Sequence, residues 1–199
     1  NVSSLTQRRH GAFPGTPMAG PGVVLILPSQ SDHLYCLNAE SGLVEWMVRS
    51  IDAQYLAAIM DDRVLTIGVS SARAYDLTKG ELIWHAPLPG NITGYGVPIP
   101  GGYLVPLDSG QVVNLDGQTG RARGFRFDPT PQPLGHLVAT TDRILSLGAM
   151  GLVSYRQAQP VLNELLARGA GEPSAETALR IAEVRLAEGN LLEGVEALE

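Results

Sequence analysis

The sequence predicts a mainly β fold made of repeated units, followed by a short α-helical tail. One pattern carries the prediction: two apolar strand residues, an Asn or Asp, three spacers, a Gly, and a Trp four positions after the Gly. The residue before the Asn or Asp stands at positions 37, 75, 115 and 155, so the copies are 38, 40 and 40 residues apart. A period near 40 with strand-like content is typical of repeat architectures. After Tyr155 the apolar spacing changes from two to 3.6, which predicts helices.

The repeat pattern decays along the chain. Eight structural repeat residues are interpreted as turn and packing residues: Asn38, Gly42, Trp46, Asp76, Gly80, Trp84, Asp116 and Gly120. The third copy has Gly124 where the Trp is expected, and the fourth starts at Leu152 and breaks off into helical sequence. An Asn or Asp side chain can bond backbone N–H groups two residues ahead, and Gly can take a positive φ, so the segment between them predicts a hairpin turn.

Short apolar runs bounded by Gly, Ser, Asp or Asn predict the strands of each copy. The runs before the Asn or Asp cover residues 23–27, 63–67, 103–107 and 143–147, and the runs after the Gly cover 43–48 and 81–86. Residues 87–102, rich in Gly and Pro, are predicted to be a long connection between units. The two tryptophans are predicted to pack against the neighbouring unit, because a large aromatic at one register of successive repeats buries much area.

Units of about 40 residues with three or four strands favour the radial blades of a β-propeller over a parallel solenoid. The strings LYCLNAESGLVEW and RAYDLTKGELIW resemble the PQQ-like repeat, and the resemblance covers about residues 14–156. That family includes quinoprotein alcohol dehydrogenases with eight blades, an outer-membrane assembly lipoprotein, and propellers without a quinone. The expected organisation is an N-terminal extension (1–13), about four PQQ-like blades (14–156) and a helical segment (157–199).

Four blades leave a geometric problem, because an unclosed half-propeller exposes apolar lateral faces. The resemblance implies a ring of seven or eight blades. The sequence therefore predicts one of three arrangements: further blades upstream, association with a second copy, or a compact four-bladed ring.

The tail is predicted to contain three helices. Pro160 opens the first, which spans 161–168, and Gly169 ends it. Ser174 is the expected N-cap of the second, with Glu176 in its first turn. Gly189 and Asn190 then break the chain before a third helix from Leu191. The series Ile181, Ala182, Gly189, Gly194 and Leu198 resembles a tetratricopeptide repeat, although Arg185 stands where that family usually has an aromatic residue.

The sequence shows no pattern of a catalytic, cofactor or metal site. The histidines His10, His33, His85 and His136 stand in different contexts without metal-binding spacing and are interpreted as ordinary surface or turn residues. Cys36, the one cysteine, lies in an apolar strand, which predicts a buried and inert thiol. The sequence contains neither a calcium-loop pattern nor a nucleophile elbow nor a phosphate-binding loop.

Charge and hydropathy exclude some partners. The net charge is −6, and residues 157–199 hold 8 acidic and 3 basic residues, so the tail carries −5 and the β part about −1. Neither part has the basic stripe of a nucleic-acid-binding protein. No stretch approaches 18 uninterrupted apolar residues, which argues against membrane insertion.

The functional prediction is a non-catalytic propeller that serves as a protein-interaction scaffold through its rim or its acidic tail. The family resemblance favours a periplasmic or other extracytoplasmic location in the bacterial envelope. Two alternatives stay open. One is a fragment of a quinone- and calcium-dependent dehydrogenase, although the chain lacks the adjacent cysteine pair that such enzymes often have. The other is a small-ligand sensor with a pocket in the central funnel.

Overall fold

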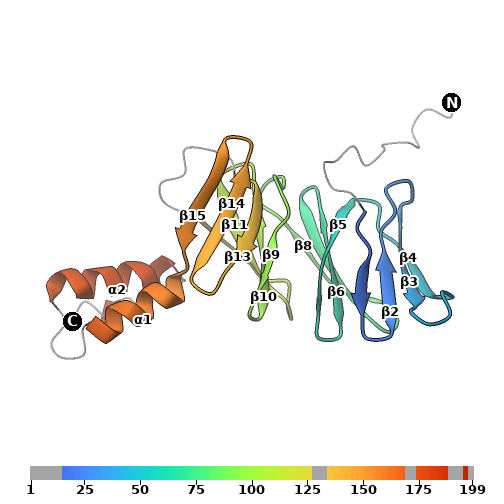
Figure 1. Ribbon diagram of the computed structural model, residues 1–199, viewed down its shortest axis with the longest axis horizontal. Helices are drawn as coiled ribbons and strands as arrows, with labels where there is room; N and C mark the ends of the chain where they lie inside the picture. The colour runs from blue at the N-terminus through green and yellow to red at the C-terminus, as the bar shows by residue number, and fades with distance from the viewer. Residues whose placement is uncertain (1–14, 127–133, 169–173, 188–194, 197–199) are drawn as a thin grey trace. The chain divides into compact units, whose positions relative to one another are not determined.

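The computed structural model describes residues 15–126, 134–168, 174–187 and 195–196. The chain forms two compact units, Asn1–Leu137 and Val138–Glu199. Antiparallel sheets dominate the described residues, and two helices follow them (Figure 1). The predicted mainly β fold with a helical tail is therefore confirmed.

The first unit contains three four-stranded antiparallel sheets, which we call blades 1, 2 and 3, and in each the strands pair in chain order. Blade 1 consists of β1 (Met18–Gly20), β2 (Val23–Ile26), β3 (His33–Asn38) and β4 (Val44–Arg49). Blade 2 consists of β5 (Ala53–Met60), β6 (Arg63–Gly68), β7 (Ser71–Asp76) and β8 (Leu82–Pro87). Blade 3 consists of β9 (Val97–Ile99), β10 (Gly102–Pro106), β11 (Gln111–Asp116) and β12 (Ala122–Arg126).

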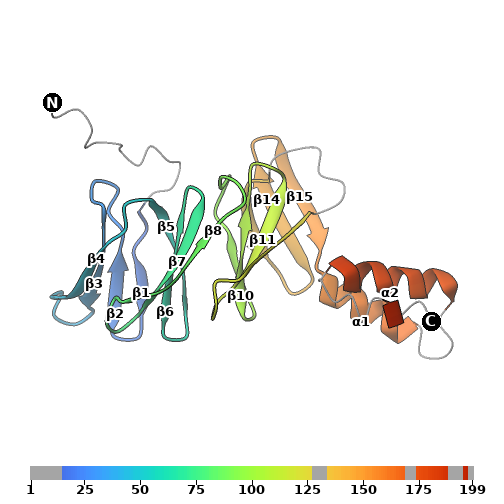
Figure 2. The ribbon, with the colours of Figure 1, turned by 180° about the vertical axis from the view of Figure 1, so that it is seen from behind.

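A fourth sheet has three strands, β13 (His136–Ala139), β14 (Arg143–Gly148) and β15 (Gly151–Arg156). The chain then enters α1 (Ala158–Arg168) and, later, α2 (Ala175–Ala187). The two helices lie side by side in both ribbon views (Figures 1 and 2). Leu162 of α1 and Ile181 and Ala182 of α2 are buried, so apolar side chains of both helices are withdrawn from solvent.

The Asx-to-Gly segments form the predicted hairpin turns. The Asn38 Oδ1 accepts hydrogen bonds from the N–H groups of Glu40 and Ser41, each at 3.0 Å, and Gly42 has a φ of 70°. Asp76 and Asp116 bond the N–H groups two and three residues ahead in the same way. The side-chain acceptor therefore closes the same turn in all three blades of the first unit.

The first strand of each sheet was not predicted. β1 and β9 have only three residues each, and β9 contains Pro98. β5 reads AQYLAAIM, which lacks the alternation of a half-buried strand because residues 55–60 form one uninterrupted apolar run. The prediction of a long connection over residues 87–102 is wrong in part, since β8 ends at Pro87 and β9 lies within that range.

The structure describes the first two predicted helices. α1 begins at Ala158, before the predicted start, and Pro160 lies in its first turn. Ser174 caps α2, because its Oγ accepts a hydrogen bond from the Thr177 N–H at 3.3 Å, and Glu176 is in the first turn as predicted. Gly169, the break at residues 189–190 and most of the expected third helix lie outside the described residues. The tetratricopeptide-like arrangement stays a prediction. No helix among the described residues is long and apolar enough to span a membrane.

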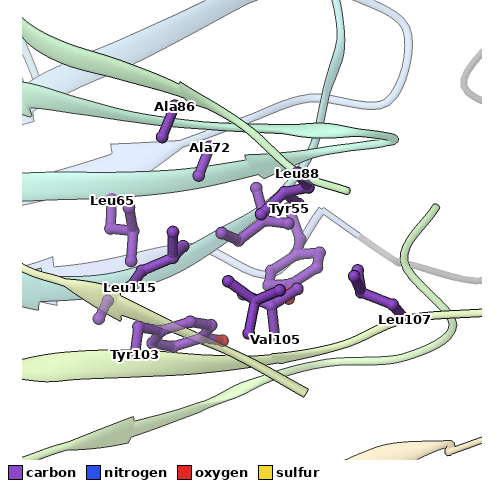
Figure 3. Close-up of a cluster of buried hydrophobic side chains, with 12 residues drawn as sticks. Tyr55, Leu65, Ala72, Ala86, Leu88, Tyr103, Val105, Leu107 and Leu115 are labelled. Carbon is purple, nitrogen blue, oxygen red and sulfur yellow. The ribbon is translucent and has the colours of Figure 1, made fainter. Parts of the chain in front are cut away.

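Two hydrophobic clusters form the core of the first unit. One joins blades 1 and 2 and includes Leu25, Leu34, Trp46, Val64 and Tyr75. The other joins blades 2 and 3, and Figure 3 shows its buried residues, with side chains of both sheets directed toward each other. The core therefore lies between blades, so the faces of neighbouring sheets stabilise one another.

Candidate functional site

The repeat residues meet across the seam between blades 1 and 2. The Trp46 ring, from β4, lies on Gly80 at the end of the hairpin turn of blade 2. A Cβ added to Gly80 would stand 2.6 Å from the indole Cε3, closer than real Cβ atoms approach. The indole N–H donates to the Leu77 carbonyl at 2.9 Å. Trp46 is therefore seated on the turn of the following copy, with its polar edge satisfied.

The seam between blades 2 and 3 repeats this arrangement. The Trp84 ring lies on Gly120, where an added Cβ would come within 2.6 Å of it, and its indole N–H donates to the Gly117 carbonyl at 3.2 Å. Arg63 of β6 also donates to that carbonyl, at 3.3 Å. Gly80 and Gly120 thus each lie against the Trp of the preceding copy.

A β-bulge directs each Trp toward the next blade. Cys36 pairs with Trp46, whereas the next residue of β3 pairs with Val44, so Glu45 is the extra residue on β4. The same bulge occurs at Ile83 on β8. Residues opposite each other in adjacent strands share a face, so the bulge puts the Trp on the face of the buried Cys36.

Blade 3 has neither the Trp nor the bulge. Its β11 and β12 pair without a shift, so Gly124 lies opposite Val113, which is buried toward blade 2. A side chain at position 124 would therefore be on the wrong face to meet a following blade. The fourth copy in turn has no Gly at the equivalent position, where Pro160 stands. Both partners of the contact are missing at this step of the chain, and the division between the two compact units follows Leu137.

The interpretation of the histidines as ordinary surface or turn residues is wrong for His136. Its ring stacks on Tyr95 at a centroid distance of 5.1 Å, and its Nδ1 accepts a hydrogen bond from the Tyr95 N–H at 2.9 Å. The Tyr95 ring also packs edge-on against the ring of the buried Tyr55, with 4.8 Å between the ring centroids. Burial raises the pKa of Tyr55 to about 12. Since β13 was not predicted, the sequence had no signal that His136 begins a strand.

The remaining cysteine and histidine candidates are not arranged as a reactive or metal-binding group among the described residues. Cys36 is fully buried and forms no disulfide, and burial raises the pKa of its thiol. His33 lies beside Asp32, with 2.7 Å between Nδ1 and Oδ1, and His85 is exposed on β8. Among the residues that the structure describes, no three His, Cys, Asp or Glu side chains gather as metal ligands would. His10 lies outside the described residues.

A polar cluster joins the connection between blades 1 and 2 to strand β7 of blade 2. Asp52, in the connection from β4 to β5, accepts hydrogen bonds from the Ser71 hydroxyl at 2.5 Å and from the Arg73 guanidinium. Burial raises the pKa of Asp52, but the hydrogen bonds from Ser71 and Arg73 outweigh it and hold the pKa below the ordinary 3.8. The ionised carboxylate is therefore the form that the folded protein prefers.

We expect Asp52→Asn to lower stability at pH 7 and to matter less in acid. The folded-state pKa is depressed, so the carboxylate contributes stability above pH 3.8, and this contribution is lost as the pH falls through the lower folded value. Urea unfolding of both proteins at pH 7 and at pH 3 measures the effect. A stability gap that stays constant between these pH values contradicts the expectation.

A family model described as outer membrane protein assembly factor BamB matches residues 3–124, which is more than half of the chain. The chain belongs to this PQQ-like repeat family. The matched range contains the seated tryptophans and their glycines, and it ends at Gly124, where the pattern loses its Trp. The recognition of PQQ-like blades from the sequence is confirmed.

Solved structures agree on the fold. BamB from Moraxella catarrhalis is 19% identical, with a TM-score of 0.57, over 69% of this chain and 44% of that protein. The computationally designed Ika4 protein is 12% identical, with a TM-score of 0.57, over 73% of this chain and 92% of that one. The designed Ika8 protein is 13% identical, with a TM-score of 0.54, over 70% and 44%. The chain thus spans less than half of the BamB structure. A search of curated protein sequences finds no match.

The outer strands of this BamB-like propeller carry exposed apolar side chains. On β4, Val44 is 56% and Met47 is 52% exposed, and on β8, Leu82 is 55% exposed. Val44 and Leu82 occupy the same register, since each pairs with the residue before the Asn or Asp of its blade. Two blades therefore present apolar groups at the same position of their last strand, and these strands are the edges of their sheets.

Proposed function

We propose that the chain is a non-catalytic PQQ-like propeller that holds protein partners on its outer strands, and that it works in the bacterial cell envelope. The observation that carries the proposal is the pair of outer strands with exposed Val44, Met47 and Leu82. Exposed apolar side chains on sheet edges are the usual means of binding another polypeptide. The described family is that of an outer membrane protein assembly factor, and this supports the proposed location.

The chemistry of the described residues supports a binding role over catalysis. The repeat residues serve packing and turns: Trp46 and Trp84 join neighbouring blades, and the Asn and Asp side chains close hairpin turns within a blade. Cys36 is fully buried, and burial raises the pKa of its thiol, which is the setting of a structural cysteine. The acidic tail, with its exposed Leu179 on α2, is the second proposed contact surface.

The test compares capture of partners from an envelope extract of the source bacterium by four immobilised proteins. These are the unaltered chain, the double variant Val44→Glu/Leu82→Glu, the variant Leu179→Glu, and the control Ser109→Glu on an exposed turn of blade 3. Adding charge to the apolar strands should reduce a specific captured protein at least tenfold, while the control leaves it unchanged. Circular dichroism and melting temperature show that each variant is folded.

Two results oppose the proposal. Equal capture by the unaltered chain and by both surface variants removes the outer strands and the tail as binding surfaces. Saturable binding of the quinone together with calcium, and dye-linked oxidation of an alcohol by the unaltered chain, would replace the scaffold with the dehydrogenase alternative.

A further inference from the structure

The segment that follows blade 3 is held by a contact of its own kind. Residues 134–137, which lead into the fourth sheet, lie against residues 94–96, which lead into β9. The two backbones approach so closely that a Cβ on Gly94 would stand 2.5 Å from the carbonyl carbon of Gly135. We call this contact between the two segments the latch.

Two hydrogen bonds cross the latch, and both involve the backbone of Tyr95. The Leu137 N–H donates to the Tyr95 carbonyl at 2.8 Å, and the Tyr95 N–H donates to His136 Nδ1 at 2.9 Å. A backbone N–H is always a donor, so the ring nitrogen that faces it has to be the unprotonated one. The latch therefore needs the neutral form of the His136 imidazole.

Protonation of the ring removes this acceptor. An imidazolium carries a hydrogen on both nitrogens, so Nδ1 of His136 would present an N–H to the Tyr95 N–H. The hydrogen bond is then lost, and two donors face each other in a partly buried place. The stack of the two rings can survive, because an aromatic face attracts a cation, but this attraction does not restore an acceptor. The change of charge is therefore felt by the backbone hydrogen bond.

The other titratable groups around the latch are tyrosines. Tyr95 stacks on His136, Tyr55 packs on Tyr95, and Tyr103 shares a hydrogen bond with Tyr55. Burial raises the pKa of all three hydroxyls, that of Tyr55 to about 12. Among the described residues, no Asp, Glu, Lys or Arg side chain adds to these shifts. The tyrosines stay neutral between pH 5 and 8, the range in which a histidine changes its charge.

The earlier seams contain no comparable group. Trp46 and Trp84 donate their indole N–H to backbone carbonyls, and neither an indole nor a carbonyl changes its charge in this pH range. The loss of the Trp after blade 3 thus coincides with a contact that depends on a titratable ring.

We propose that the latch is a pH-dependent attachment, in which neutral His136 holds residues 134–137 on residues 94–96 and protonated His136 releases them. The attachment is present above the pH at which the ring takes up its proton and is lost below it. The released residues lead into the fourth sheet, because His136 is the first residue of β13 and the division between the two compact units follows Leu137.

Amide hydrogen exchange of the unaltered chain, resolved by NMR at pH 7.5 and pH 5, tests the latch. After correction for the intrinsic effect of pH on exchange, the protection of the Tyr95 and Leu137 amides should be at least about tenfold lower at pH 5. Leu88 and Leu107 are internal references from the same unit, since the N–H of each donates to a backbone carbonyl at 2.9 Å. Their protection should be the same at both pH values.

Two variants separate the acceptor from the ring. In His136→Asn the amide oxygen takes the place of Nδ1 and does not titrate, so the pH dependence at Tyr95 should disappear. In His136→Phe a ring remains for the stack but no acceptor, so protection at Tyr95 should be low at both pH values. His85→Gln is the control, because His85 is an exposed histidine on β8, and it should leave the pH dependence unchanged.

Equal protection of Tyr95 and Leu137 at the two pH values in the unaltered chain would overturn the proposal. The same fall in His136→Asn as in the unaltered chain would also overturn it. A fall that Leu88 and Leu107 share would do so too, since acid would then loosen the whole first unit. None of these readouts involves the exposed residues of β4 and β8, so the scaffold proposal can fail while this one stands.

Discussion

Replacing Trp46 by Ala should lower the free energy of unfolding of the first unit by about 3–5 kcal/mol, the usual cost of removing a buried Trp. The ring is 9% exposed and lies on Gly80, and its N–H satisfies the Leu77 carbonyl. A domain is commonly stable by only about 5–15 kcal/mol, so this one contact is a large fraction of the total. Urea unfolding followed by the fluorescence of Trp84, the one Trp left in the variant, measures the change in the same unit.

The conservative variant Trp46→Phe separates the two parts of the contact. Phe keeps an aromatic ring over Gly80 but has no N–H to donate, so its cost should be smaller than that of Ala. A loss below about 1 kcal/mol for Trp46→Ala, which is the range of ordinary surface substitutions and weak contacts, would show that the seam does not depend on this ring.

Gly80→Ala should destabilise the protein by about 2–4 kcal/mol, from two causes that add. The φ of 72° costs about 1 kcal/mol for a residue with a Cβ, and the methyl would stand 2.6 Å from the Trp46 ring, an overpacking that costs a further 1–3 kcal/mol. Gly42→Ala is the matched control, because Gly42 has nearly the same φ and no neighbour within 4 Å among the described residues.

The difference between the two variants isolates the collision with the indole from the strain of the backbone. Chemical denaturation of both proteins under the same conditions gives that difference directly. If Gly80→Ala and Gly42→Ala cost the same, the close approach of Trp46 to Gly80 contributes nothing, and the repeat glycines serve only their turns. If the collision is real, the double variant Trp46→Ala/Gly80→Ala should lose less free energy of unfolding than the sum of the losses of the two single variants.

The repeat was readable from the sequence because turn chemistry is local. Asn38 and Gly42 lie four positions apart, and the hydrogen bonds and the positive φ that they supply need no residue from elsewhere. The short first strands were not readable, because β1 and β9 have too few residues to show a period. For the same reason the sequence did not place His136 at the start of β13 against Tyr95.

The direction of the tryptophan contacts needed the structure too. A fixed period says that Trp46 and Trp84 occupy equivalent positions, but it does not say whether each packs on the copy before it or after it. The bulge at Glu45 decides this, since one extra residue turns the Trp to the face of Cys36 and so toward blade 2. Nothing in the residue types around Glu45 distinguishes a bulge from a regular pair.

The sequence by itself determined the repeat period, the hairpin turns, the strand content and the family, because these follow from side-chain chemistry within a few residues. Only the tertiary structure decided which Gly lies against which Trp, and that Gly42 has no Trp against it among the described residues. Those facts depend on faces of separate sheets meeting in space. Contacts between sheets depend on strand register and on packing between residues about 40 positions apart, which a local sequence pattern does not specify.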